Sequence, residues 1–207
     1  EALVTEINLK VDGITAVLNS DTTITLSNTD GGEIVLADAA GQGLTDVGFT
    51  AGTYEGYVTL ENLDGSAVVV EAGNQANGYV STDTAAGLLS DLRTLGFNQT
   101  TKDGLGIVSG VTTSITDLTK ANALKLLRTD NVQINGVYIG DSVNDSAGSK
   151  ADAINALTAE HGVTATAATK VSMDLDFNVT SPTATEFTLN GVIVNVNGDT
   201  NTQEVVD

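Results

Sequence analysis

Short apolar runs alternate with polar residues along much of this chain, and Gly-containing turns separate them, which predicts antiparallel strands joined by hairpins. The segment 5–18 opens this pattern. Apolar residues fall at every second position from Ile7 to Val11, and an Asp12-Gly13 pair follows before the next apolar run. Asp and Gly tolerate the positive φ values of a tight turn, so we predict a hairpin over this segment.

One stretch of the chain is duplicated. Residues 132–155 (VQINGVYIGDSVNDSAGSKADAIN) resemble residues 187–207 (FTLNGVIVNVNGDTNTQEVVD) at an offset of 55 residues, so that Ile134 matches Leu189. In the first copy a predicted helix follows Asp152, whereas the second copy reaches the last residue of the sequence where that helix should continue. We therefore expect the chain to be a segment of a longer protein.

The duplicated segment begins with a predicted hairpin. Its Asn135-Gly136 pair favours a type I′ turn, which places Ile134 opposite Val137 and Val132 opposite Ile139 on one apolar face. The second copy repeats this face with Phe187, Leu189, Val192 and Val194.

A helix and a strand complete the unit. The helix is predicted over 151–161, because Ser149 and Asp152 resemble a capping box at its start and Gly162 is a natural stop at its end. Residues 163–167 (VTATA) then return as a strand. Each unit is thus predicted to consist of a hairpin, a helix and a strand.

A second repeat lies in the first half of the chain. Residues 25–41 resemble residues 59–73 at an offset of 34, and residues 47–56 resemble residues 95–104 at an offset of 48. The change of offset implies an insertion around 74–92 in the second copy. Unequal spacing of this kind is typical of duplicated β-units and not of a solenoid.

Two further helices are predicted in the middle of the chain. The first starts at a capping residue, Ser81, Thr82 or Asp83, and ends at Gly96. The second covers 115–129, where apolar residues recur at helical spacing.

These elements predict an α+β, mainly β fold of antiparallel hairpins with a few short helices packed on the sheets, in two subdomains. Residues 1–22 with 131–207 are expected to form a base subdomain that contains the hairpin-helix-strand units. Residues 23–130 are expected to form an outer β-rich subdomain with an internal repeat.

Charge and composition narrow the possible partners. The chain has 8 Lys and Arg residues against 27 Asp and Glu residues, a formal net charge of −19. Nucleic acid and anionic membranes would both be repelled, so neither is expected as a partner. The sequence has no Cys, which excludes disulfides and thiolate sites, and no apolar run long enough to span a membrane.

The residues able to perform catalysis are few. His161 is the sole histidine, and we interpret it as a structural residue in the last turn of a helix. The segment 159–163 (AEHGV) lacks the spacing of a zinc-binding HExxH helix. Paired carboxylates are abundant, but a sugar-cleaving cleft usually has aromatic platforms and Trp is absent. No catalytic or cofactor-binding residue is assigned, and no cofactor is expected.

Candidate binding residues are equally sparse. Oxygen-bearing side chains alternate over 197–204 as a cation loop would require, but we interpret this segment as a turn entering a helix because it lacks EF-hand spacing. The four residues concerned are Asn197, Asp199, Asn201 and Glu204. Asp30-Gly31 and Asp64-Gly65 are interpreted as turns. Glycosylation sequons occur at Asn98, Asn144 and Asn178 and are expected by chance in an Asn- and Thr-rich chain. No metal ligand is assigned.

Three segments in order resemble a known family: INGVYIG, ADAINAL and GVTATA, within residues 134–167. They are similar to the flagellin hook IN motif, named for an Ile-Asn pair that here is Ile154-Asn155. The motif occurs in bacterial flagellin and in other flagellar axial proteins, including the filament cap. The Thr- and Gly-rich repeats look more like the central variable region of a flagellin, so flagellin is preferred.

The resemblance implies a structural, non-enzymatic role in the filament that drives bacterial motility. In that family, terminal helices polymerise inside the filament and hypervariable domains face outward. No sustained heptad pattern is present at either end of this chain, so we expect it to be an outer segment, secreted and extracellular, whose contacts with other flagellin subunits run through regions missing here. The segment itself is expected to be monomeric. The alternatives are a fragment of a filament-cap or hook-associated protein, and an extracellular adhesin-like binding module.

Overall fold

The computed structural model describes residues 2–19, 23–39, 44, 47–66, 68–71, 95–97, 125–128, 132–175 and 186–195. Within these residues, three antiparallel sheets and a few short helices confirm the α+β, mainly β class. The predicted helix that ends at Gly96 falls almost wholly outside these residues. Of the predicted helix over 115–129 only 125–128 are described, and 125–127 are not helical.

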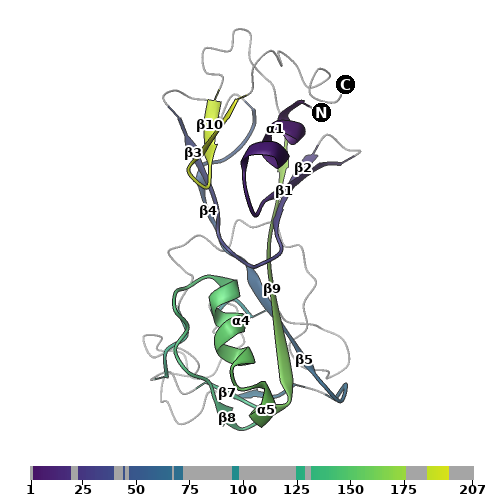
Figure 1. Cartoon of the computed structure of the whole chain (residues 1–207), viewed down its shortest axis with the longest axis vertical. Helices are drawn as coiled ribbons and strands as arrows, with labels where there is room; N and C mark the ends of the chain where they lie inside the picture. Colours follow the sequence, from purple (N-terminus) through teal and green to yellow (C-terminus); the bar gives the residue numbers. More distant parts are fainter. Residues whose placement is uncertain are drawn as a thin grey trace.

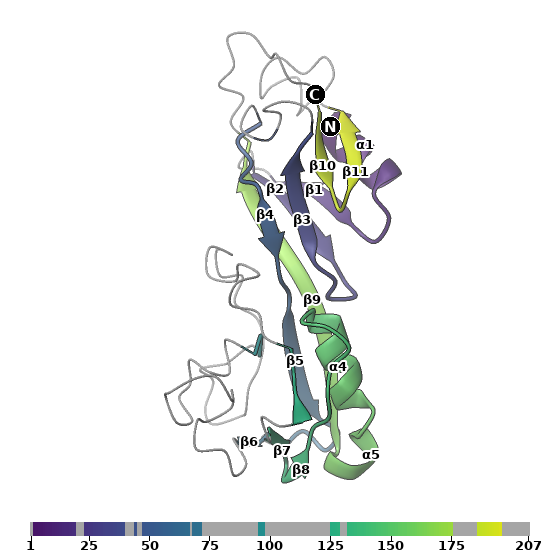
Figure 2. The ribbon, with the colours of Figure 1, turned by 90° about the vertical axis from the view of Figure 1, so that its left-hand side faces the viewer.

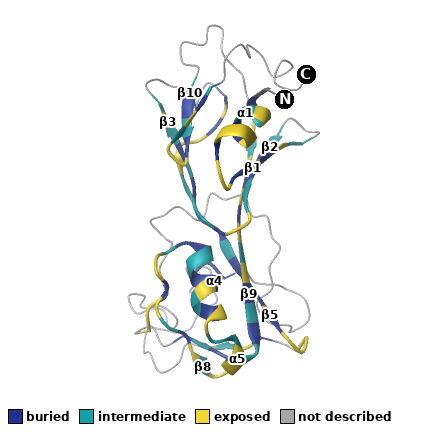
Figure 3. Cartoon of the chain, viewed as in Figure 1, coloured by how far each residue is buried: buried dark blue, intermediate teal, exposed yellow. Residues whose placement is uncertain are grey.

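The elements gather around two hydrophobic cores, one at each end of an elongated molecule (Figures 1 and 3). The first group, which we call the terminal unit, contains the first and last described elements of the chain. It comprises α1 (Ala2–Lys10), β1 (Thr15–Leu18), β2 (Thr23–Asn28), β3 (Ile34–Asp38), β4 (Gly52–Tyr54), β10 (Glu186–Leu189) and β11 (Val192–Asn195). In its core Phe49 meets Phe187 edge to face, with ring centroids 5.7 Å apart.

The second group, which we call the central unit, forms the other end of the molecule. It comprises β5 (Tyr57–Asn62), β6 (Val70–Glu71), β7 (Gln133–Ile134), β8 (Val137–Tyr138), α4 (Ala147–Asn155), α5 (Thr158–His161) and the first half of β9 (Val163–Asp174). Helix α4 lies along one face of β9 (Figure 2) and buries Ala151 and Ile154 against it.

Strand β9 belongs to both units. Its first half, residues 163–168, pairs with β5, and its second half, residues 169–174, pairs with β2. The resulting sheet has the order β1-β2-β9-β5, so a single strand runs the length of the molecule (Figure 1). The other two sheets, β11-β10-β3-β4 and β6-β7-β8, each lie in one unit.

Both Asn-Gly hairpins form as predicted. Asn135 and Gly136 have φ values of 48° and 79°, and the equivalent pair in the β10–β11 turn has 50° and 78°, as a type I′ turn requires. Ile134 pairs with Val137, and the Ile139 amide donates to the Val132 carbonyl. The predicted apolar faces of both hairpins contribute to the two cores, except for Val137, which is half-buried and belongs to neither core.

The two hairpins also bind a neighbouring strand in the same way. The Asn135 side chain accepts from the Val69 amide at 3.0 Å, while the Asn135 amide donates to the Val69 carbonyl. In the terminal unit Asn190 makes the same pair of bonds with Val35, at 2.7 Å and 2.8 Å. The two hairpins are related by the offset of 55, and the two strands that they bind are related by the offset of 34. The two sequence repeats therefore correspond to one contact that occurs in both units.

A second asparagine in each unit clamps the helix to the following strand. The Asn155 side chain accepts from the Ala165 amide at 2.8 Å and donates to the Ala165 carbonyl at 2.9 Å. The Asn8 side chain does the same to Ala16, at 2.7 Å and 3.0 Å. Asn8 follows Ile7 as Asn155 follows Ile154, so α1 occupies in the terminal unit the place that α4 occupies in the central unit.

The repeats in the first half of the chain are likewise confirmed where they are described. Strand β5 matches β2 residue for residue at the offset of 34. Gly48 and Gly96 both have positive φ, at 83° and 77°, and the Phe that follows each of them is buried in its unit's core.

The hairpin predicted over 5–18 is wrong, because its first strand is helix α1. The buried residues are Leu3, Ile7 and Val11, which recur every four positions, whereas Leu9 is 79% exposed. This spacing belongs to a helix face, and the apparent alternation came from counting Leu9 as inward-facing.

The predicted start of the helix after the first hairpin is also wrong. Ser146, and not Ser149, is the N-cap, since its hydroxyl accepts from the Ser149 amide and α4 begins at Ala147. The helix is interrupted after Asn155, and α5 ends at Gly162, which adopts the left-handed conformation expected of a C-terminal stop.

The segments that share each core are not the segments that were expected to share a subdomain. Strands β2 and β3, from the expected outer subdomain, share a core with α1 and β10. Helix α4, from the expected base, shares a core with β5. The expected subdomains followed the order of the segments along the chain, whereas each observed unit contains segments from both halves of the chain.

Candidate functional site

His161 is a buried structural residue. Its Nδ1 accepts a hydrogen bond from the Val163 amide at 3.0 Å, so Nε2 carries the proton and donates to the Ile154 carbonyl at 3.0 Å. The ring is 4% exposed and joins the end of α5 to α4 and β9. Because both ring nitrogens are engaged, His161 is not placed to act as a general base.

The other residues considered from the sequence are turn residues or lie outside the described part of the chain. Asp30 and Asp64 precede glycines with φ of 70° and 73°, as turns require. Asn144 is exposed, and its side chain accepts from the Ser146 amide and hydroxyl. The sequon residues Asn98 and Asn178 and all four residues of the 197–204 segment fall outside the described residues.

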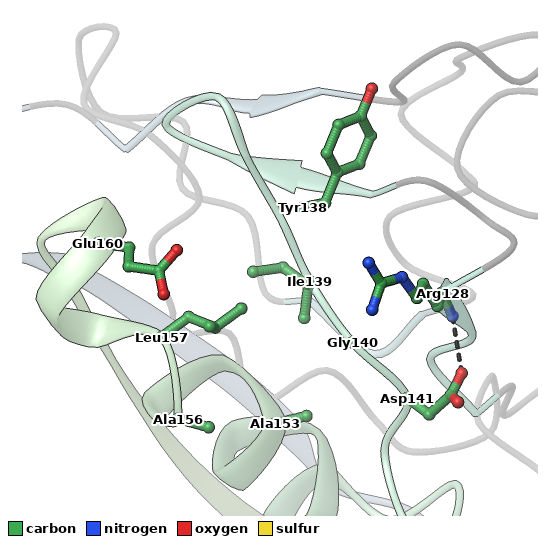
Figure 4. Close-up of a pocket in the computed structure, with 9 residues that line it drawn as sticks. All are labelled: Arg128, Tyr138, Ile139, Gly140, Asp141, Ala153, Ala156, Leu157 and Glu160. Carbon is green, nitrogen blue, oxygen red and sulfur yellow. Dashed lines mark hydrogen bonds between the residues drawn. The ribbon is translucent and has the colours of Figure 1, made fainter.

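One pocket lies beside α4, between that helix and the segment that leaves the first hairpin (Figure 4). Its volume is about 400 Å³. It is lined by Arg128, Tyr138, Ile139, Gly140, Asp141, Ala153, Ala156, Leu157 and Glu160. The Arg128 guanidinium and the Glu160 carboxylate lie on opposite sides, with Ile139 and Leu157 between them (Figure 4).

This pocket has charge at its rim and hydrocarbon at its base. The Arg128 backbone amide donates to Asp141 Oδ1 at 2.7 Å, which holds Arg128 beside the segment that follows β8. The nine lining residues include no Ser, Thr, Cys or His, so no Ser, Thr or Cys nucleophile lies beside a histidine base in this pocket.

A partly buried ionic cluster lies where the two units meet. One carboxylate oxygen from each of Glu33, Glu55 and Asp145 lies within 4.8 Å of the other two. Glu55 is 3% exposed, and Lys150 beside it is 1% exposed. Glu33 precedes β3, Glu55 lies between β4 and β5, and Asp145 directly precedes the N-cap of α4. The cluster therefore connects three segments that are far apart in the sequence.

Burial lowers the pKa of Lys150 from 10.5 to about 8, and the nearby carboxylates of Glu55 and Asp145 partly oppose that effect. When Asn8 and Asn155 are aligned in the sequence, Lys150 takes the position that Leu3 has in α1. Both side chains are fully buried. The central unit thus replaces a core leucine with a lysine that faces carboxylates.

Sequence reasoning missed this cluster and the asparagine clamp of the terminal unit. The clamp had a visible signal, because the Ile7-Asn8 pair repeats the Ile154-Asn155 pair. The cluster had none, since its members come from separate segments that only the fold brings together.

Among the described residues, no helix is long and apolar enough to cross a membrane. The chain matches no protein-family model, no curated protein and no solved structure.

Proposed function

We propose that this chain is an outward-facing, non-catalytic segment of a flagellin subunit, exposed on the extracellular surface of the filament that drives motility. The observation that carries the proposal is the Ile-Asn unit, in which an asparagine after a buried isoleucine clamps a helix to the next strand. The chain contains two such units, at Asn8 and at Asn155.

The arrangement of the chain in the terminal unit supports this role. Helix α1 packs against β11, and the Asn195 side chain donates to the Glu6 carboxylate at 3.3 Å. In the resembling family, outer domains are inserted between two helices that pack side by side. A segment of that kind needs its first and last elements to be neighbours, and α1 and β11, the first and last described elements, are neighbours.

The charge of the chain suits the same role. A net charge of −19 on a surface repeated along a filament repels neighbouring filaments and limits lateral association. The isolated segment is proposed to be monomeric, because subunit contacts in this family run through the assembly helices.

Immunogold electron microscopy tests the proposal. Antibodies raised against this chain are applied to cells that express the parent gene, and labelling along the whole length of the flagellar filament is expected. Labelling confined to the filament tip or to the hook junction would indicate a cap or hook-associated protein. Labelling of the cell body would indicate an adhesin-like module, and either result would overturn the flagellin assignment.

A further inference from the structure

The pocket beside α4 has a positive and a negative group on opposite sides. The Arg128 guanidinium and the Glu160 carboxylate are exposed, and neither forms an ion pair or a side-chain hydrogen bond with another described residue. The apolar side chains of Ile139 and Leu157 lie between them (Figure 4). The pocket therefore presents a positive end, an apolar middle and a negative end.

The equivalent place in the terminal unit is bridged by polar side chains. The Asn195 side chain, on β11, donates to the Glu6 carboxylate, on α1, at 3.3 Å. Lys10, one turn further along α1, forms an ion pair with the same carboxylate. These contacts join the helix of the terminal unit to its hairpin.

The central unit has small residues at both ends of this bridge. When the asparagine clamps of the two units are aligned in the sequence, Ala153 takes the position of Glu6. The offset of 55 between the hairpins places Gly140 at the position of Asn195. Both Ala153 and Gly140 line the pocket, and neither has a side chain able to form the bridge. The pocket thus lies where the central unit lacks a contact that the terminal unit makes.

The size and charge of the pocket limit what it can hold. Its volume of about 400 Å³ lies within the range of ligand pockets, roughly 300–1,000 Å³. Among its lining residues Arg128 is positive, while Asp141 and Glu160 are negative. These carboxylates and the charge of −19 on the whole chain would repel a purely anionic ligand. A purely cationic ligand would leave the guanidinium without a partner, whereas a ligand with one charge of each sign satisfies both ends.

We propose that this pocket binds a small ω-amino carboxylate, a molecule with a carboxylate and an ammonium group at opposite ends of a short hydrocarbon chain. The parallel N–H donors of the Arg128 guanidinium fit the two oxygens of a carboxylate. The ligand's ammonium group donates to the Glu160 carboxylate on the other side, and its methylene groups cover Ile139 and Leu157. Burial of these methylene groups adds to two exposed ion pairs that are weak by themselves.

The test is a titration of the full, ¹⁵N-labelled chain with 6-aminohexanoate, followed through the amide chemical shifts. Because exposed ion pairs are weak, we expect a Kd on the order of 1 mM, with saturable shifts at the amides of Ile139, Ala156 and Leu157. Hexanoate and hexylamine each carry one of the two charges and should bind about fivefold more weakly or worse. If either binds as tightly as 6-aminohexanoate, or if no pocket amide shifts at about 10 mM of that probe, the proposal is rejected.

Neutral variants assign the two ends of the pocket. Arg128→Gln and Glu160→Gln should each lower the affinity for 6-aminohexanoate by about fivefold, because each removes one ion pair. The matched controls are Lys170→Gln on β9 and Glu61→Gln on β5, which remove exposed charges outside the lining residues. Equal losses in the controls and the pocket variants would show a general charge effect and overturn the site.

A double variant rebuilds the bridge of the terminal unit inside the pocket. Gly140→Asn with Ala153→Glu introduces the side chains that Asn195 and Glu6 supply there. Gly140 tolerates a side chain, because a Cβ on it meets no atom within 4 Å. Thermal unfolding checks that the variant folds, and we expect it to lose saturable binding of 6-aminohexanoate. Retained affinity would place the binding elsewhere and overturn the proposal, whatever the outcome of the filament labelling.

Discussion

The terminal and central units make equivalent contacts with equivalent residues, yet the chain runs through them in different orders. In the central unit the hairpin β7–β8, the helix α4 and the strand β9 follow one another. In the terminal unit the helix α1 and the strand β1 come first, and the hairpin β10–β11 comes last. The strand orders β8-β7-β6 and β11-β10-β3 nevertheless correspond, as do β9-β5 and β1-β2.

This difference shows that the unit is defined by packing and not by covalent order. The β10–β11 hairpin pairs with β3 in the same register, and with the same asparagine hydrogen bonds, as the β7–β8 hairpin pairs with β6. This match holds although the helix follows the hairpin along the chain in the central unit only. The two units are related as circular permutants. Their differences are then informative, because a residue in one unit has a natural control in the other.

The largest expected difference concerns the glycines of the two matching turns. Gly31 and Gly65 have nearly the same φ, at 70° and 73°, but a Cβ on Gly31 would overlap the Ala167 side chain and the backbone at Gly148, whereas a Cβ on Gly65 meets nothing within 4 Å. Gly65→Ala should lower the free energy of unfolding by about 1 kcal/mol, the cost of a left-handed alanine. Gly31→Ala should lower it by roughly 3 kcal/mol or more, because overlap is added. Urea denaturation measures the free energy of unfolding of both variants. If both lose the same amount, the residues around Gly31 move aside for the added methyl group without a cost in free energy.

The next largest effect concerns the buried charge that distinguishes α4 from α1. Lys150 releases its proton near pH 8 in the folded state and near 10.5 when unfolded. Between these values the unfolded state holds more protons, so stability should rise with pH by up to about 3 kcal/mol, at about 1.4 kcal/mol per pH unit. Denaturation in a chelating buffer from pH 7 to 10 measures this slope.

Lys150→Leu, which restores the residue found at the Leu3 position, is the matched control. It should remove the rise in stability between pH 8 and pH 10. An unchanged slope in this variant would assign the titration to another group.

The smallest expected effect concerns the asparagine clamps. Asn8→Ala and Asn155→Ala each remove two hydrogen bonds between a side chain and a strand, at a cost of about 2 kcal/mol. Similar losses in both would confirm that the clamps are equivalent. Asn195→Ala, which removes one longer bond to Glu6, should cost clearly less. Thermal and urea unfolding compare the three variants.

The hairpins were predictable from the sequence because their turns are local. Asn135-Gly136 and its repeat at Asn190 specify the turn, the register and the inward face from a few adjacent residues. The mainly β fold class was predictable from the alternation of apolar and polar residues along the strands. Helix α1 was missed because its segment is short. When Leu9 is counted as buried, the apolar residues in so short a segment fit the period of a strand as well as that of a helix.

The candidate site depended on contacts that no local pattern encodes. Lys150 reads as an ordinary helix surface residue, and only the approach of Glu55 and Asp145 makes it part of a buried cluster. The division into two units was equally hidden, since each unit takes strands from both halves of the chain. His161 was correctly placed at a helix end, but its burial and its two hydrogen bonds required coordinates.

Strand β9 has a mechanical consequence for the molecule. Because β2 and β5 hold successive halves of one strand, melting of either hydrophobic cluster would release half of a strand whose other half remains paired in the other unit. A calorimetric scan should then show a single heat-absorption peak in place of two. Under tension along its length, this shared strand would distribute the load over both clusters and make the elongated body behave as one stiff rod.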